Sequence, residues 1–66
     1  MKTLNLSATQ RLGCLVRYNL NKFYVYLADG CFVTSAIDKT DLKAQLAANK
    51  IQNAQFDAIA QCMYLG

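Results

Sequence analysis

The stretch that decides the fold is Phe23-Tyr24-Val25-Tyr26-Leu27-Ala28-Asp29-Gly30-Cys31-Phe32-Val33-Thr34-Ser35-Ala36-Ile37. Its first six residues are rich in aromatic and β-branched side chains, which favour a strand. Asp29-Gly30 is the kind of dipeptide that closes a two-residue type I′ turn. The apolar residues after it indicate a returning strand. The stretch therefore predicts a hairpin of strands 23–28 and 31–37, in which Val25 faces Thr34 and Tyr26 faces Val33.

The segment before this hairpin, residues 11–18, is compatible with two structures. As a strand, it places Val16 opposite Val25, and both hairpins then put their apolar residues on one common face. As a helix, it would begin with a capping box at residues 7–10, but Gly13 would cost such a helix about 1 kcal/mol relative to Ala. We favour the strand. The first half of the chain then forms a three-stranded antiparallel β-meander.

The chain changes to helical patterns after residue 38. Asp38 can cap a helix over residues 39–49, and Asn53 can cap a second helix over residues 53–64. Because an apolar sheet face needs a cover, both helices are expected on the same side. The sequence thus predicts an α+β fold, a three-stranded antiparallel sheet followed by two C-terminal helices packed on one face. The predicted core contains Val16, Val25, Leu27, Phe32, Leu42, Leu46, Phe56, Ile59 and Met63.

Length and composition limit the protein to one small domain, residues 1–66. Hydrophobic residues make up 55% of the chain, more than the thin core of so small a domain can hide, so part of them should form an exposed patch. The longest apolar stretch, Phe23 to Ala28, is far shorter than the roughly 18 residues of a membrane-spanning helix. Residues 1–7 contain no apolar run of signal-peptide length. We therefore expect a cytoplasmic protein.

The residues that usually carry enzyme chemistry are scarce. The chain has no histidine and no glutamate, and each of its four aspartates suits a turn or a helix start. Cys14, Cys31 and Cys62 are odd in number and lack C-x-x-C spacing, which indicates reduced thiols and no zinc site. No glycine loop could hold a phosphate. We therefore expect no catalytic residues, no metal, no cofactor and no enzymatic activity.

The uncovered face of the predicted sheet is the expected binding surface. Residues 1–27 carry four basic side chains and no acidic one, whereas residues 28–66 carry three lysines against four aspartates. Tyrosine and arginine are enriched at binding hot spots, and exposed apolar residues among them favour an interface over a merely solvated sheet face. The predicted binding residues are Arg11, Arg17, Lys22, Tyr24, Tyr26 and Val33.

Three kinds of partner fit this face. A larger protein or nucleoprotein complex could be blocked or adapted by a non-catalytic binding protein, and this is the hypothesis we favour. A nucleic acid could place phosphates on Arg11, Arg17 and Lys22 and stack bases on tyrosines. A second copy of the chain could pack sheet to sheet or edge to edge as a homodimer. No membrane partner is expected.

In length, in strand-then-helix order and in its Arg11/Arg17/Tyr24/Tyr26 surface, the chain resembles the small proteins that phages and mobile elements use against host defences, including anti-CRISPR proteins. The resemblance implies a protein without catalytic residues that inhibits a large complex by occupying a site on it. Many such inhibitors are acidic DNA mimics. A chain of net charge +3 departs from that subset, because it cannot imitate a phosphate backbone.

Overall fold

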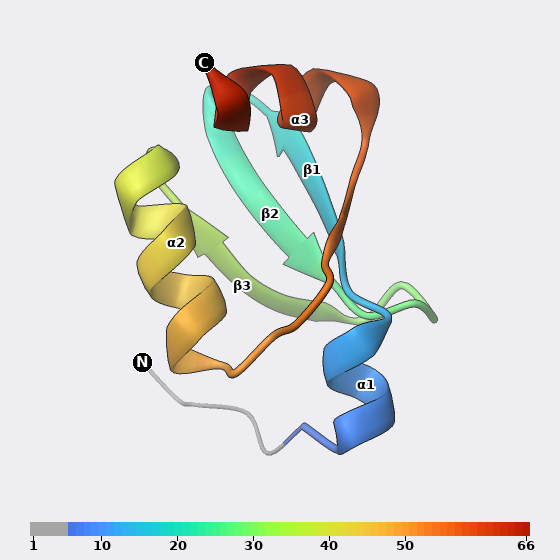
Figure 1. Cartoon of the computed structure of the whole chain (residues 1–66). Coiled ribbons are helices and arrows are strands. Elements are labelled where there is room, and N and C mark those ends of the chain that lie inside the picture. The colour runs from blue at the N-terminus through green and yellow to red at the C-terminus, as the bar shows by residue number, and fades with distance from the viewer. Residues whose placement is uncertain (1–5) are drawn as a thin grey trace.

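The computed structural model describes residues 6–66. Residues 1–5, which include Lys2 and most of the segment without a signal-peptide pattern, lie outside the described part. The elements, in chain order, are α1 (Ala8–Leu12), β1 (Leu15–Asn19), β2 (Lys22–Tyr26), β3 (Phe32–Ala36), α2 (Lys39–Ala48), β4 (Gln55–Phe56) and α3 (Ala58–Leu65) (Figure 1). No helix within 6–66 has the length and apolar character that a membrane crossing requires.

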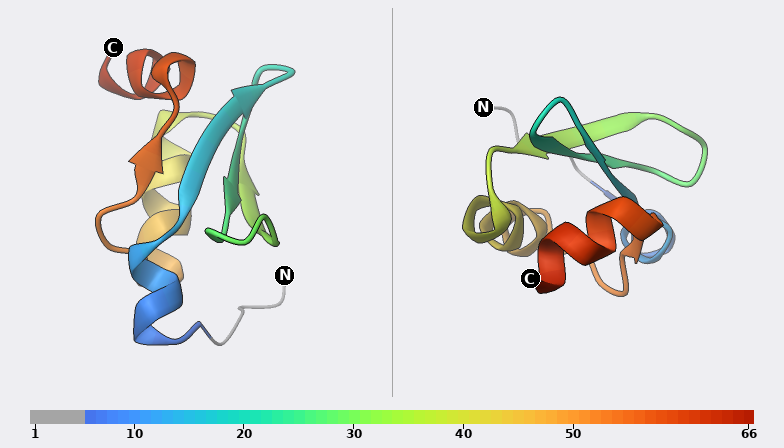
Figure 2. Two further views of the ribbon diagram at one scale, coloured as in Figure 1. Left: turned by 90° about the vertical axis from the view of Figure 1, so that its right-hand side faces the viewer. Right: turned by 90° about the horizontal axis from the view of Figure 1, so that it is seen from above.

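The strands form one sheet in the order β3-β2-β1-β4. β1, β2 and β3 are antiparallel neighbours, and β4 pairs with β1 in parallel. α2 packs on β3 and α3 packs on β1, so both C-terminal helices lie on the same side of the sheet (Figures 1 and 2). The predicted α+β fold, an antiparallel meander followed by helices, is therefore confirmed, and a short fourth strand is added to it.

The register between β1 and β2 is the predicted one, with Val16 opposite Val25. The connecting turn is tight, because Asn19 pairs with Lys22 and only Leu20 and Asn21 lie between them. Both turn residues have positive φ, 52° for Leu20 and 63° for Asn21, as a type I′ turn requires. This turn continues the right-handed twist of the two strands and fixes which side chains face the core.

The turn between β2 and β3 is longer than predicted. The Leu27 amide donates to the Cys31 carbonyl at 2.8 Å, and the Gly30 amide donates to the Leu27 carbonyl at 2.9 Å, so residues 28–30 form the loop. Gly30 has a φ of 95°, which a side chain would oppose. Tyr26 therefore pairs with Phe32, and the prediction that Tyr26 faces Val33 is wrong.

A β-bulge corrects this slip within the next pair of residues. The register shifts between Val25 and Tyr26, so that Val25 faces Thr34 as predicted while Val33 is the extra residue on β3. The bulge turns Val33 inward, where it is 8% exposed, and turns Phe32 outward, where it is 53% exposed. Phe32 is consequently not a core residue, and Val33 is.

Residues 8–18 adopt both of the structures that the sequence allows, one after the other. Ser7 and Gln10 form the capping box: the Gln10 amide donates to Ser7 Oγ, and the Ser7 amide donates to Gln10 Oε1. α1 follows and ends at Gly13, and β1 begins at Leu15. The prediction of a continuous strand over residues 11–18 is therefore wrong in its first part, because a local cap stabilises the helix there.

α2 forms as predicted. The Asp38 carboxylate accepts from the Asp41 amide at 2.7 Å and caps the helix, and Asn49 ends it. Leu42 is fully buried and Leu46 packs against the core cluster. The other side of that core comes from Cys14, just before β1, and from the strand residues Val16, Phe23, Val25, Val33 and Ala36.

The last helix starts later than predicted. Asp57, not Asn53, is its N-cap, and Phe56 belongs to β4, where the Asp57 amide donates to the Val16 carbonyl at 3.1 Å. The helix consequently turns Ala60, fully buried, toward β1, and Tyr64 follows one turn later against the Phe56 ring at a centroid distance of 4.9 Å. Ile59 and Met63, predicted in the core, are 64% and 41% exposed.

A candidate binding surface on the open face of the sheet

The open face is the side of the sheet that points away from α2 and α3. Side chains alternate across a strand, so the neighbours of buried Val16 and Val25 point to the open side. β3 joins them through Phe32, because of the bulge. We define the open face by its residues Leu15, Arg17, Lys22, Tyr24, Tyr26, Phe32 and Ser35.

Two cross-strand rows organise the open face. In the first row, Leu15 pairs with Tyr26 and Tyr26 with Phe32, and the two rings meet edge to face at 6.0 Å and 70°. In the second row, Arg17 pairs with Tyr24. Cross-strand aromatic contacts of this kind hold side chains in fixed orientations. The apolar row and the Arg–Tyr row thus lie side by side on a rigid support.

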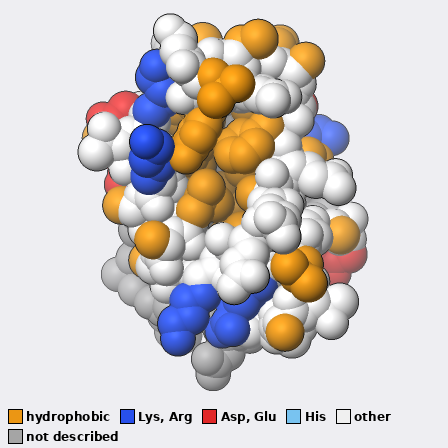
Figure 3. All heavy atoms as spheres, in the orientation of Figure 1, with side chains coloured by type: hydrophobic (Ala, Val, Ile, Leu, Met, Phe, Trp, Pro, Cys, Tyr) orange, Lys and Arg blue, Asp and Glu red, His pale blue; other side chains and the backbone are white. Residues whose placement is uncertain are grey.

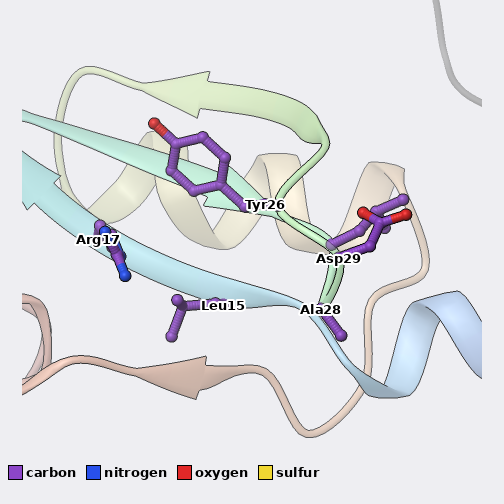
Figure 4. Close-up of a pocket in the computed structure, with 7 residues that line it drawn as sticks. Leu15, Arg17, Tyr26, Ala28 and Asp29 are labelled. Atoms are coloured by element: carbon purple, nitrogen blue, oxygen red, sulfur yellow. The ribbon is translucent and has the colours of Figure 1, made fainter.

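A shallow depression of about 400 Å³ lies where the first row meets the loop of residues 28–30. Leu15, Arg17 and Tyr26 line its strand side (Figure 4). In that view α2 lies behind the sheet, and the Tyr26 ring presents a face to the reader. The depression is open to solvent and combines a guanidinium, an aromatic ring and an aliphatic side chain.

The open face is positively charged. Its strands carry Arg17 and Lys22, and none of the described strands contains Asp or Glu. Three of the four aspartates lie away from this face, and their carboxylates accept hydrogen bonds from backbone amides. Asp38 accepts from the Asp41 amide, Asp41 from the Ile37 amide and Asp57 from the Ala60 amide. Each of these carboxylates stabilises a helix start or its approach, as the sequence predicts for aspartates.

Asp29, the fourth aspartate, lines the depression together with Arg17 and Tyr26. Its Oδ1 accepts from the Cys31 amide at 2.9 Å, and this hydrogen bond holds the pKa of Asp29 below its ordinary value. Asp29 in turn raises the pKa of the Cys31 thiol, because it hydrogen-bonds to the protonated thiol and opposes the thiolate charge. Asp29 therefore remains a carboxylate of the loop, and Cys31 remains a thiol.

The structure brings together four of the six predicted binding residues. Arg17, Lys22, Tyr24 and Tyr26 share the open face. Arg11 lies in α1, half-buried, with its Nε buried and without a hydrogen-bond partner. Val33 is in the core.

Sequence reasoning missed Phe32 as a member of the open face. The only sequence signal for its position is Asp29-Gly30, which suits both the two-residue turn and the longer one, and no residue type marks the bulge at Val33. The partner of the Tyr26 ring could therefore not be read from the sequence.

A second apolar surface lies on α3. Ile59, Met63 and Leu65 are exposed, at 64%, 41% and 75%, and Met63 also lines a depression beside Tyr18 and Phe23. Figure 3 shows the helix side of the molecule, where hydrophobic side chains gather at the α3 end and basic side chains lie beside α2. On this side the Lys43 Nζ already lies over the Tyr64 ring at 5.8 Å from its centroid, and Tyr64 packs against Phe56, so this ring is engaged within the chain.

The residues in 6–66 form no cluster of three or more His, Cys, Asp or Glu side chains that could hold a metal ion. Comparison of the chain with protein-family models, with curated proteins and with solved structures finds no match.

Proposed function

We propose that this chain is a non-catalytic binding protein, an inhibitor of the anti-CRISPR kind that docks on a larger protein or nucleoprotein complex through its open face. One observation carries the proposal. Helices cover a single side of the sheet, while the other side presents the continuous row Leu15–Tyr26–Phe32 beside Arg17. Solvent does not favour an exposed Phe32 ring beside two half-buried tyrosines, whereas a partner that covers them gains apolar contact and hydrogen bonds.

The side chains of the open face are suited to recognition. Tyr24 and Tyr26 are half-buried, and a tyrosine has few rotatable bonds, so they lose little conformational freedom when a partner covers them. Arg17 is exposed and offers a rigid set of donors. Rigid aromatic anchors around an arginine are typical of binding hot spots.

The proposed location is the cytoplasm. Cys14, Cys31 and Cys62 are all free thiols, as proteins of a reducing compartment usually have. A complex of the host cell interior, such as a defence complex, is accessible to such a protein.

Affinity capture from cells of the organism that encodes the chain tests the proposal. The open-face variant combines Arg17→Ala, Tyr24→Ala and Tyr26→Ala. The matched control combines Lys39→Ala, Ile59→Ala and Met63→Ala, which remove one charge and two exposed apolar side chains from the helix side. We expect the open-face variant to lose its partner by about 30-fold or more in affinity, since hot-spot residues each contribute at that level.

The control variant is expected to keep the partner. Thermal melting and circular dichroism of both variants verify that the fold persists. Capture of the same partner at wild-type level by a folded open-face variant would refute the proposed surface.

A further inference from the structure

We infer that the open face binds a single-stranded nucleic acid, with bases stacked on Tyr24 and Tyr26 and phosphates held by Arg17 and Lys22. This inference rests on the proposed function and names the chemistry of the partner at the same surface. A single strand of nucleic acid within a nucleoprotein complex would be a partner consistent with both proposals.

Positive charge is a feature of the open face. Residues 6–66 contain six basic and four acidic side chains. When Arg17 and Lys22 are set apart, the remaining four basic side chains equal the four aspartates in number. Those four basic side chains lie on α1, on α2 and just after α2, so Arg17 and Lys22 give the open face a local positive charge; its strands carry no carboxylate, and Asp29 lines its depression. A polyanion complements such a surface.

The tyrosine rings of the open face are regularly spaced along β2. Tyr24 and Tyr26 alternate along β2, so they project to the same side about 7 Å apart. Phe32 contacts the Tyr26 ring edge to face, and Tyr26 is half-buried and lines the depression (Figure 4). Exposed ring faces on a sheet are the platform on which unpaired bases stack.

The two cations of the open face lie close to the tyrosines in the sheet register. Arg17 lies directly across from Tyr24 in the β1–β2 register, and Lys22 is two residues before Tyr24 on the same side of β2. A strand whose bases lie on the two tyrosines would pass its phosphates near both cations. The depression between Arg17, Tyr26 and the loop of residues 28–30 offers room for one base.

These features favour a single strand over the two other macromolecular partners. In a duplex the bases are stacked on one another, so ring faces that lie on a sheet cannot reach them. An acidic protein surface would match Arg17 and Lys22 but would leave the tyrosine faces without planar partners. The combination of rings and cations on one face is typical of single-strand binding surfaces.

Fluorescence anisotropy with a labelled oligothymidylate of about 12 nucleotides tests the inference. The open-face pair is Arg17→Gln with Lys22→Gln, and the matched control pair is Lys39→Gln with Lys43→Gln on α2, which removes the same charge from the other side. Salt is varied from about 50 mM to about 200 mM. Two phosphate contacts predict a slope of log affinity against log salt near −1.4, roughly −0.7 per contact.

We expect the open-face pair to abolish most binding and flatten this slope, and the control pair to stay within about twofold of the wild type. Tyr26→Ala should weaken binding by roughly 5- to 150-fold at unchanged slope, the loss of one base stack, and Tyr26→Phe should restore it. Restoration by Phe separates stacking from any loss of fold.

Absence of binding at the lowest salt, or equal weakening by the two charge pairs, would overturn the inference. If the oligothymidylate does not bind while affinity capture still yields a partner through the open face, the nucleic-acid inference fails and the proposed function stands. If the open-face variant also keeps its captured partner, both fail.

Discussion

Phe23 and Phe32 lie in neighbouring strands, but the bulge at Val33 puts their side chains on opposite faces of the sheet. Phe23 is 3% exposed and Phe32 is 53% exposed. We predict that Phe23→Ala destabilises the domain by about 3–5 kcal/mol, the usual cost of an emptied aromatic site in a core. Phe32→Ala should cost only about 1 kcal/mol, the value of its edge-to-face contact with Tyr26.

Urea denaturation of the two variants measures this difference directly. The two variants are matched controls for each other, because the same kind of side chain is truncated on adjacent strands. Equal destabilisation by both substitutions would mean that Phe32 is a core residue, as the simple alternation of strand residues predicts, and that the bulge is absent.

At the scale of elements, a left-handed residue that is not glycine follows the C-cap of α2. Lys50 has a φ of 55°, its amide donates to the Ala47 carbonyl at 3.0 Å, and the Ile51 amide donates to the Leu46 carbonyl at 2.9 Å. This pair of bonds is a Schellman motif, in which the left-handed position favours glycine. We predict that Lys50→Gly stabilises the domain by about 0.5–1 kcal/mol, because it relieves the steric cost of a side chain there.

Ala44→Gly is the matched control for this prediction. Ala44 is exposed within α2, so glycine there should destabilise by about 1 kcal/mol through lost helix propensity. The midpoints of urea denaturation show whether each variant is more or less stable than the wild type. A Lys50→Gly variant less stable than the wild type would contradict the assigned end of α2.

The elements also show what sequence patterns can and cannot specify here. The hairpins and α2 follow from local signals, namely turn residues, strand alternation and the Asp38 cap. β4 was not predictable, because a two-residue strand between Ala54 and Asp57 has no periodicity of its own and is stabilised by pairing with β1. The inward side of α3 depends on that pairing, so the apolar spacing of Ile59 and Met63 gave the wrong side.

At the scale of the whole molecule, the sequence located most of the open face but not its boundary. Arg17, Lys22, Tyr24 and Tyr26 lie together because the β1–β2 register was predictable from alternation. Arg11 lies outside this group because the capping box draws its segment into α1. The described residues thus divide into a side that α2 and α3 cover and an aromatic, basic side that they leave uncovered.

Recognition of a partner through the open face is the central claim, and site-specific photocrosslinking in cells tests this claim most directly. A benzophenone-bearing phenylalanine replaces Tyr24 on the open face or Met63 on α3, and its adducts are identified by mass after irradiation. The account predicts a discrete adduct from position 24 and none from position 63. An adduct from position 63 with none from position 24 would contradict it.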